Sequence, residues 1–362
     1  MGSAVEIGYK LLNSDYFCPL SMDQLAELKA LLKSPQKIAI VTHFKPDADA
    51  LGSSLGLAGF LKKNGHEVNV ITPSDFPDFL LWMPGSHEVV AHTKKSTQPL
   101  AKATRLFQTA DLIFCLDFSS LSRINDLSEI VRQAPAKKIM VDHHLQPESF
   151  ADFQKWNVSA ASTAQLIFEL IEELDGKSSM DAGIASCLYA GLMTDTGSFR
   201  HNNTTARELA IAAELVLMGA NPSEIARLIY DVNSLSKLRL VGYALSQKLV
   251  VIPEYNTAYI TLSQDELKKL DAQTGDTEGL VNYGLSIKGI QLAVLMYDRG
   301  EEIKISFRSL GDFSVNELAR KHFEGGGHKN ASGGSSKLSL EETLKKFLDL
   351  LPEYKKKLLN HS

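Results

Sequence analysis

Three short, continuous apolar runs stand out in the first half of the chain. They are KIAIVTH at 37–43, DLIFCLD at 111–117 and KKIMVDHH at 137–144. Apolar runs of this length without polar alternation are typical of strands that are buried on both faces of a parallel sheet. Each run therefore predicts one strand of such a sheet.

Helical patterns lie between and after these runs. Residues 163–174 place their apolar side chains on one helical face, namely Leu166, Ile167, Leu170, Ile171 and Leu174. A further helix starts with a capping box of Thr205 and Glu208 and stops at Gly219, and Asn221 caps the next one. Strands that alternate with helices in this way predict an α/β fold.

From about residue 255 onward the pattern is different. Segments 256–267, 289–309 and 314–334 predict a strand, a β-hairpin around the turn DRGEE, and a helix followed by a glycine-rich loop. We therefore expect an N-terminal extension at 1–20, a first domain at 21–234, a helical connector at 235–254, a smaller second domain at 255–352 and a tail at 353–362.

Length and composition limit the function. A chain of 362 residues with 44% hydrophobic and 22% charged residues is typical of a globular protein of about two domains. Its net charge of −5 argues against binding of long nucleic acid through many phosphates, while a short anionic ligand in one local site still fits. The three cysteines form no CxxC pair and no apolar run is long enough to span a bilayer, so we expect a cytoplasmic protein without a membrane partner.

Acids and histidines gather where the three strand-like runs end. They are His43, Asp47 and Asp49 after the first run, Asp117 at the end of the second, Asp142, His143 and His144 at the end of the third, and Asp195 after a later helical segment. Ligands of parallel α/β sheets bind beyond the carboxyl ends of the strands. If the three strands are neighbours, these side chains meet in one place.

So many carboxylates and imidazoles suit two divalent ions better than one. Two ions about 3.5–4 Å apart can share a carboxylate and activate a bridging water for attack on phosphorus. Mixed oxygen and nitrogen ligands favour Mn²⁺ over Mg²⁺ and Ca²⁺. Each residue alone also has an ordinary interpretation: Asp49 could cap the following helix, and His143 and His144 could be hydrogen-bonded core histidines. Their joint occurrence at three strand ends favours the metal site.

Four motifs resemble, in order, those of the DHH phosphoesterase superfamily: HFKPDADALGSSLG at 43–56, CLDFSSLSRI at 115–124, VDHH at 141–144 and GLMTDTGSFR at 191–200. FRS, followed by EGGGHKNASGG at 324–334, resembles the DHH-associated C-terminal domain with its GGGH loop. The resemblance implies an N-terminal parallel-sheet domain with helices on both faces, a smaller C-terminal α/β domain, and an active site in the cleft between them.

The resemblance also implies roles for individual residues. One ion would be held by His43, Asp47 and Asp117, and the other by Asp49, Asp117, His143 and Asp195, so that Asp117 bridges them. Asp142 would orient the site, and His144 would face the substrate phosphate or the leaving group. Asp117, Asp142 and His144 are therefore the expected catalytic residues.

The glycine-rich segment is the expected substrate-binding part of the second domain. A glycine run alone is commonly a flexible linker, but consecutive glycine amides can form an anion-binding nest, and an arginine can clamp a phosphate. The resemblance assigns this role to Arg308, Gly326, Gly327 and His328. Arg123 and Arg200 are further candidates, although a lone arginine commonly forms a surface ion pair.

Among the branches of this superfamily, the chain is most similar to the nano-RNases that also act as pAp phosphatases. We find no Ser-Arg-Lys type motif of manganese-dependent pyrophosphatases, no nucleic-acid-binding module of RecJ-like exonucleases and no membrane-anchored N-terminal segment. We therefore expect a hydrolase with two Mn²⁺ ions, replaceable by Mg²⁺ or Co²⁺, that cleaves short oligonucleotides and pAp and does not bind long duplexes.

Three alternatives remain open: a phosphodiesterase of linear or cyclic dinucleotides, a pyrophosphatase or exopolyphosphatase, and a nucleotide-binding sensor without catalysis. The complete set of expected ligands favours an enzyme over the sensor. A homodimer is compatible with each of these interpretations.

Overall fold

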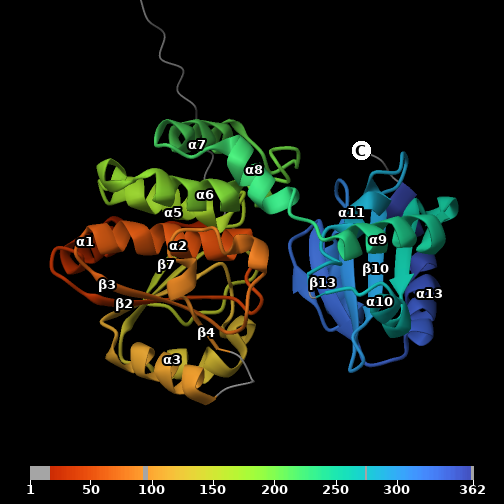
Figure 1. Ribbon diagram of the computed structural model, residues 1–362, viewed down its shortest axis with the longest axis horizontal. Coiled ribbons are helices and arrows are strands. Elements are labelled where there is room, and N and C mark those ends of the chain that lie inside the picture. The colour runs from red at the N-terminus through yellow and green to blue at the C-terminus, as the bar shows by residue number, and fades with distance from the viewer. Residues whose placement is uncertain (1–16, 93–96, 274, 360–362) are drawn as a thin grey trace, which may run out of the picture. The chain divides into compact units, whose positions relative to one another are not determined.

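Two separate sheets organise the chain (Figure 1), and the division between the two compact units falls between Val232 and Asn233. The computed structural model describes residues 17–92, 97–273 and 275–359. The expected N-terminal extension at 1–20 therefore lies mostly outside the described residues.

The first unit contains a sheet with the strand order β1-β7-β6-β5-β2-β3-β4. Its strands are β1 (Phe17–Cys18), β2 (Lys37–Thr42), β3 (Glu67–Thr72), β4 (Val90–Ala91), β5 (Leu112–Leu116), β6 (Lys137–Asp142) and β7 (Phe153–Asn157). All neighbours from β7 to β4 are parallel, and only the short β1 runs antiparallel to β7. The three predicted strands are β2, β5 and β6, and they lie next to one another in the middle of the sheet. The predicted parallel sheet is confirmed.

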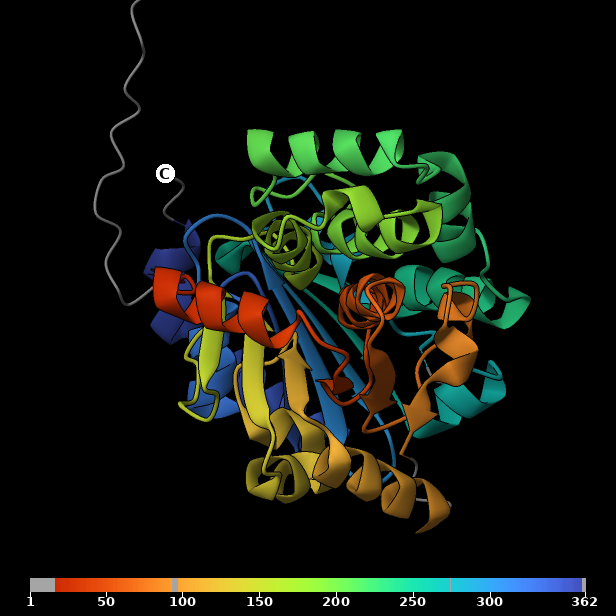
Figure 2. The same cartoon turned by 90° about the vertical axis from the view of Figure 1, so that its left-hand side faces the viewer.

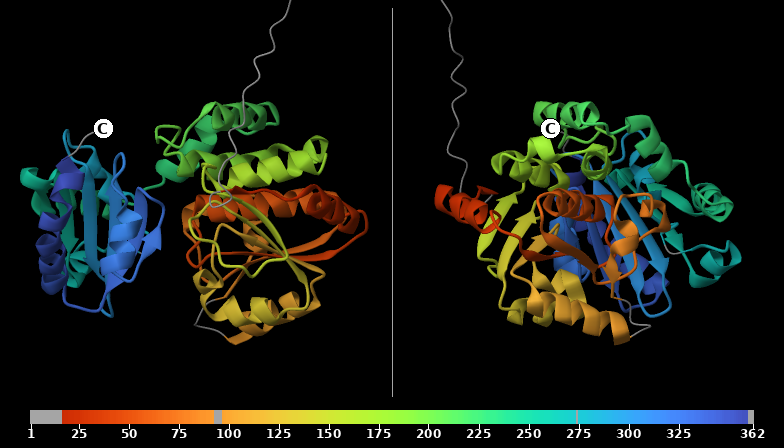
Figure 3. Two further views of the ribbon diagram at one scale, coloured as in Figure 1. Left: turned by 180° about the vertical axis from the view of Figure 1, so that it is seen from behind. Right: turned by 60° about the vertical axis from the view of Figure 1, so that its left-hand side comes forward.

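Helices cover both faces of this sheet, as Figures 2 and 3 show. The helices of the unit are α1 (Met22–Leu31), α2 (Ala48–Lys63), α3 (Thr97–Thr109), α4 (Ser128–Gln133), α5 (Thr163–Glu173), α6 (Ala182–Asp195), α7 (Ala206–Leu217) and α8 (Pro222–Tyr230). Ile38 and Ile40 of β2 pack into the core under α2, α5 and α6, whereas Ala39 and Val41 pack toward α3 and α4. Because successive strand residues point to opposite faces, a strand buried on both faces needs a continuous apolar run.

Among the described residues, no single helix is long and apolar enough to cross a membrane. The pair α7 and α8 meets the length and composition criteria only when both helices are taken together, and a bend of 105° separates them.

The second unit contains a six-stranded sheet with the order β12-β13-β11-β10-β9-β8. Its elements are α9 (Leu235–Tyr243), β8 (Leu249–Ile252), β9 (Thr257–Leu262), α10 (Gln264–Lys269), α11 (Leu280–Leu285), β10 (Leu292–Asp298), β11 (Ile303–Ser309), α12 (Val315–His322), β12 (Gly326–Gly327), β13 (Ala331–Ser336) and α13 (Leu340–Leu359). Only β9 and β10 are parallel. β10 and β11 form the predicted hairpin, and α12 follows as predicted.

Two segments that were expected to be a connector and a tail contain regular elements of the second unit. Residues 235–254, expected as a connector, contain α9 and β8, and β8 pairs with β9 inside the second sheet. Residues 353–362, expected as a tail, begin within α13, which continues to Leu359.

The glycine-rich segment is a short hairpin at the edge of the sheet rather than an irregular loop. Gly326 and Gly327 form β12 and pair with β13. The backbones approach so closely that a Cβ on Gly325 would lie 2.2 Å from the carbonyl oxygen of Gly333. Gly327 has φ 142, which side chains disfavour. The glycines are therefore required by packing against β13 as well as by any role in binding.

Candidate metal centre

The strand order brings the predicted acids and histidines to one edge of the first sheet. His43 follows β2, Asp117 follows β5, and Asp142 is the last residue of β6. These three strands are direct neighbours in the order β6-β5-β2, so their carboxyl ends lie side by side. α2 starts beside this edge with Asp47 as its N-cap, and α6 ends at Asp195. The predicted residues are thus supplied by three strand ends and two helix ends.

Asp117 lies at the centre of the group. Its Oδ2 atom is 3.4 Å from Nε2 of His43, and its Oδ1 atom is 3.5 Å from Nε2 of His143. Oδ1 is also 3.7 Å from Nδ1 of His144. The Asp117 residue is only 2% exposed. One buried carboxylate therefore faces three imidazole rings.

A second set of acids surrounds His143. Its Nε2 atom lies 3.4 Å from Oδ2 of Asp195 and 3.8 Å from Oδ2 of Asp49. Among the described residues of the first unit, three groups could each hold an ion: His43 with Asp47 and Asp117, Asp49 with Asp117 and His143, and Asp117 with Asp142 and His144. Asp117 is the member that all three groups share. The structure therefore brings together all eight acids and histidines that were predicted in this unit.

Local structure holds each acid in place. Asp47 caps α2, because its Oδ1 accepts the N–H groups of Asp49 and Ala50. The Asp49 side chain instead accepts the N–H groups of Thr163 and Ala164 at the start of α5. The cap of α2 is thus Asp47, and not Asp49 as in the ordinary interpretation of the sequence. Asp47 and Asp49 are thus each fixed by two backbone donors.

The backbone of Asp117 adopts φ 64, in the left-handed region that non-glycine residues rarely enter. Its N–H donates to the carbonyl oxygen of Val141 at the end of β6. Strained backbone of this kind concentrates at functional sites.

Carbonyl groups orient the histidines. Nδ1 of His43 lies 3.0 Å from the carbonyl oxygen of Phe44, and Nδ1 of His143 lies 3.2 Å from that of Ala160. With the proton on Nδ1, Nε2 presents its lone pair to the acids, which is the usual arrangement of a metal-binding histidine. His144 differs, because its Nδ1 lies 2.8 Å from Oδ1 of Asp142. The carboxylate at the end of β6, rather than a carbonyl group, thus orients the ring of His144.

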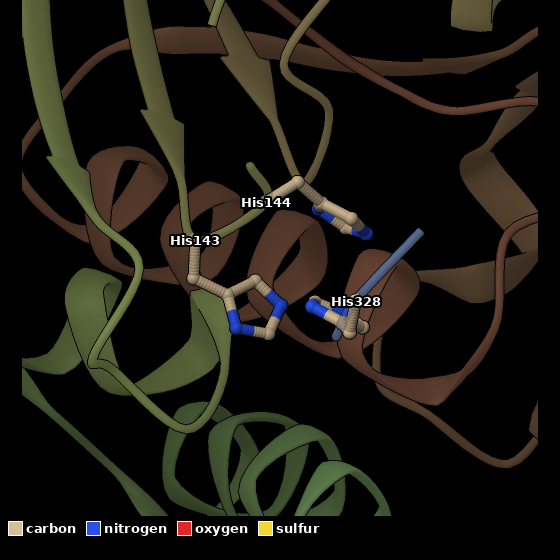
Figure 4. A group of neighbouring side chains, drawn as sticks. All are labelled: His143, His144 and His328. Atoms are coloured by element: carbon tan, nitrogen blue, oxygen red, sulfur yellow. The ribbon is translucent and has the colours of Figure 1, made fainter. Parts of the chain in front are cut away.

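Figure 4 shows the rings of His143 and His144 next to each other; their centroids are 5.0 Å apart and their planes meet at 73°. His328, which is also drawn there, belongs to the second unit. The two adjacent histidines both face Asp117 but differ in their other acids. His143 faces Asp49 and Asp195, whereas Nδ1 of His144 contacts Asp142.

The crowding of charge shifts the pKa values of this group. Burial and the charge of Asp117 raise the pKa of Asp49 well above its usual range. Burial and the charge of Asp49 do the same to the pKa of Asp195, although its side chain is 22% exposed. Burial opposes charge on His143, but its hydrogen bond to Asp117 and the nearby acids outweigh burial and raise its pKa well above normal.

Burial also disfavours the charged form of His43, but Asp117 and Asp47 outweigh burial and raise its pKa. For Asp117 itself, burial favours the neutral form, but hydrogen bonds to His143 and His43 hold its pKa well below its usual range. The site thus retains protons that a bound cation would displace.

The donor set fits divalent cations. Oδ2 of Asp142 is fully buried and accepts no hydrogen bond from any residue that the structure describes. Buried carboxylates this close together are costly unless positive charge lies among them. Carboxylate oxygens combined with imidazole nitrogens suit borderline ions such as Mn²⁺. The arrangement could therefore hold metal and present it to a phosphate at the sheet edge.

Two arginines of the first unit are predicted site residues, and they lie in the segments that follow β5 and α6. The carbonyl of Arg123 accepts the N–H of Phe44, and its charge opposes protonation of His43. Arg200 lies in the turn that follows α6, where its Nε donates to the carbonyl of Gly197. Both side chains are exposed. They are thus accessible from solvent.

The predicted residues of the second unit also gather at one place. Arg308 lies on β11 directly opposite Ala331 of β13. The turn before Ala331 carries His328, whose N–H donates to the Ala331 carbonyl. The strand alternation points Phe307 into the core and leaves Arg308 on the other face, where it is half-buried. Arg308 on β11 and the glycines of β12 therefore flank the same strand, β13, and His328 lies in the turn between β12 and β13.

Sequence reasoning missed two side chains at these places. Thr163 donates its hydroxyl to Oδ1 of Asp117, although 46 positions separate them. Arg320 lies beside the glycine hairpin, since a Cβ on Gly326 would be 3.5 Å from its Nε atom. No motif marks either residue, and only the three-dimensional contact identifies them.

Comparison with known proteins gives two family matches. Residues 37–192 match the family described as "DHH family, N-terminal domain", and residues 255–357 match the "DHHA1 domain". The chain is 32% identical over 333 residues to the bifunctional oligoribonuclease and PAP phosphatase NrnA of Thermus thermophilus, covering 92% of this chain and 94% of that protein. It is 30% identical to the protein of the same name from Bacillus subtilis, over 82% of this chain and 88% of that one.

One solved structure is similar over nearly its whole length. It is the crystal structure of an exopolyphosphatase-related protein from Bacteroides fragilis, which is 42% identical. The TM-score is 0.89, and the match covers 94% of this chain and 99% of the other. The similarity thus extends over both units of this chain.

Proposed function

The chain belongs to the DHH family, with a DHH domain followed by a DHHA1 domain, and on that premise we propose that it hydrolyses short oligonucleotides and pAp with the help of two Mn²⁺ ions. The observation that carries this proposal is the position of Asp117, which takes part in all three groups of the first unit that could hold an ion. The two relatives named as oligoribonuclease and PAP phosphatase support the substrate class.

The proposed ligands divide into two sets that share Asp117. His43 and Asp47 would hold one ion, and Asp49, His143 and Asp195 would hold the other, with Asp117 contacting both. When bound, such ions lower the pKa of a shared water and neutralise charge on the phosphate; Mg²⁺ or Co²⁺ could replace Mn²⁺. Backbone donors fix Asp47 and Asp49 before substrate arrives, so less reorganisation of these two acids accompanies the reaction.

His144, oriented by Asp142, would protonate the leaving group. The bond between Oδ1 of Asp142 and Nδ1 of His144 fixes the orientation of the ring. We propose that Nε2 of His144 gives its proton to the departing ribose oxygen as the bond between phosphorus and that oxygen breaks. The oxygen of the attacking water takes its place on phosphorus. The proton that this water loses passes to solvent, and His144 regains a proton from solvent, so one hydrolytic event is complete.

We propose that the second unit binds a phosphate of the substrate other than the reacting one. The guanidinium of Arg308 offers paired donors that match phosphate oxygens. The backbone of Gly326 and Gly327 lies across β13 from the strand of Arg308, and His328 follows it in the turn to β13. Arg123 and Arg200 are proposed to contact substrate from the first unit, because both are exposed and lie a few positions after the acids Asp117 and Asp195.

A panel of phosphate compounds tests this function. The full chain with Mn²⁺ would be given pAp, a linear dinucleotide, RNA strands of about 5 and about 24 nucleotides, cyclic di-AMP, pyrophosphate and polyphosphate. We expect hydrolysis of pAp, of the dinucleotide and of the shorter strand, with rates that fall as strands lengthen, because the net charge of −5 offers no long track of cations. Processive digestion of the longer strand, or cleavage of pyrophosphate alone, would overturn the proposal.

A further inference from the structure

We infer that Thr163, the first residue of α5, is a positioning residue that divides the two oxygens of Asp117 between the two metal positions. The inference rests on the proposed function, since it concerns the same carboxylate. It assigns to this chain a determinant of metal affinity that is not itself a ligand.

Thr163 contacts both central acids. Its hydroxyl donates to Oδ1 of Asp117 over 2.8 Å, and its backbone N–H donates to Oδ2 of Asp49 over 2.6 Å. The residue is fully buried. Ser162 caps α5 with its own side chain, which accepts the N–H of Gln165. The first N–H groups of the helix are therefore left to bind Asp49 rather than the cap.

The hydroxyl bond determines which oxygen of Asp117 faces which side. Oδ1 receives the Thr163 proton and is turned toward His143, at 3.5 Å. Oδ2 receives no bond from Thr163 and lies 3.4 Å from His43. The terminal torsion of an aspartate is soft, so the carboxylate plane needs such a bond to stay fixed. Without the hydroxyl, rotation of this plane would move both oxygens away from their positions together.

If Thr163 positions Asp117, removal of its hydroxyl should lower the affinity for metal. Hydrogen-bond partners of metal ligands typically change metal affinity by about 10–100-fold when removed. The backbone N–H of residue 163 survives any side-chain change, so Asp49 keeps its bonds to α5. The effect of changing the side chain should therefore arise from Asp117 alone.

The test uses Mn²⁺ binding to the metal-stripped full chain, measured by electron paramagnetic resonance of the free ion. Thr163→Val removes the hydroxyl at nearly constant shape, Thr163→Ala removes it without a replacement methyl group, and Thr163→Ser retains it. We expect Mn²⁺ affinity to fall by about 10–100-fold in the Val and Ala variants and to stay within about threefold of wild type in the Ser variant. Melting of the metal-free forms shows which variants are folded, and Thr163→Ala replaces Thr163→Val should the latter fail to fold.

The outcomes separate this inference from the function on which it rests. Wild-type protein that binds no divalent ion would overturn the metal site and the proposed function together. Wild-type protein that binds Mn²⁺ while the folded Val or Ala variant binds it equally well would overturn only the role of Thr163. Equal weakening in the Ser, Val and Ala variants would also overturn it, because the hydroxyl would then not be the determinant.

Discussion

Gly191 lies directly against Asp49: a Cβ on Gly191 would lie 2.7 Å from Oδ1 of Asp49 and 3.1 Å from its Cα atom. Gly191 belongs to α6 and Asp49 to α2, and each helix carries an acid of the candidate metal centre. The absence of a side chain at position 191 thus allows the two helices to bring Asp49 and Asp195 to the same imidazole.

The first prediction concerns this contact. Gly191→Ala should force α2 and α6 apart, lower the free energy of unfolding by about 1–3 kcal/mol and weaken Mn²⁺ binding, because overpacking a filled site shifts the backbone. Denaturant unfolding of the metal-free protein and Mn²⁺ titration measure the two effects. Gly242→Ala is the matched control, because Gly242 lies in α9 and nothing lies within 4 Å of a Cβ at that position. This variant should raise the free energy of unfolding by about 0.5–1 kcal/mol. A Gly191→Ala protein with wild-type stability and wild-type binding would show that the contact is not restrictive.

The second prediction concerns pH. The pKa of His143 is raised in the folded chain, so folded protein binds more protons than unfolded protein near neutral pH. The stability that its charge contributes is therefore present below about pH 6.5 and is lost as pH rises through the higher folded pKa. The pKa values of Asp49 and Asp195 are also raised in the folded chain. The stability that these two groups contribute is therefore also lost as pH rises, starting from about pH 4. Metal-free protein should lose stability from this group as pH increases.

Other histidines titrate with the opposite sign, so the test compares two proteins. Burial lowers the pKa values of His66 and His322, which favours folding at higher pH. Melting temperatures of EDTA-treated wild type and His143→Gln should therefore be measured from about pH 5.5 to about pH 8.5. The stability of wild type relative to the variant should decrease as pH rises. Because bound metal displaces these protons, the apparent Mn²⁺ affinity should rise over the same interval. A difference that grows with pH would contradict the assignment.

The central strands of the first sheet could be predicted from the sequence, but its outer strands could not. β2, β5 and β6 are continuous apolar runs, and their order confirmed that the acids converge. β7 was missed because Gln154 and Lys155 interrupt its pattern. Lys155 is nevertheless buried, since its ammonium group forms an ion pair with Glu173 on α5. A partner 18 positions away can make a charged residue compatible with the core, and local pattern does not show it.

Some residues of the candidate site could likewise be predicted from the sequence, and others could not. The acids and histidines could be found because each follows a strand or begins a helix, where the fold class alone places ligands. Thr163 and Gly191 could not, because their importance depends on distances to Asp117 and Asp49 that arise only when α5, α6 and α2 pack together. The glycine hairpin was expected as a loop, since two residues of β12 are too few to show a strand pattern.

The third prediction concerns the second unit. Arg308→Ala should raise KM for pAp by about 10–100-fold, the value of a charge-assisted hydrogen bond, with a smaller effect on kcat. His328→Ala should act in the same direction. Arg308→Lys should restore only part of the loss, because an ammonium group does not reproduce the paired donors. Steady-state kinetics and metal analysis measure these effects, and metal content should stay unchanged.

Arg299→Ala is the matched control for this series, since Arg299 is an exposed arginine at the turn of the same hairpin. It should leave KM within about twofold of wild type. Wild-type KM in both Arg308→Ala and His328→Ala would mean that this part of the second unit does not bind the substrate phosphate. Loss of metal in His328→Ala would assign that residue a different role.

The most direct test of the account is the number of Mn²⁺ ions bound per chain by wild type and by Asp117→Asn, with pAp hydrolysis measured on the same samples. Asparagine tolerates the left-handed backbone at φ 64 better than alanine does, so the variant should fold. The account predicts two ions and turnover for wild type, and fewer ions with no detectable turnover for Asp117→Asn. Two tightly bound ions and near wild-type turnover in Asp117→Asn would contradict the claim that this carboxylate joins the two metal positions.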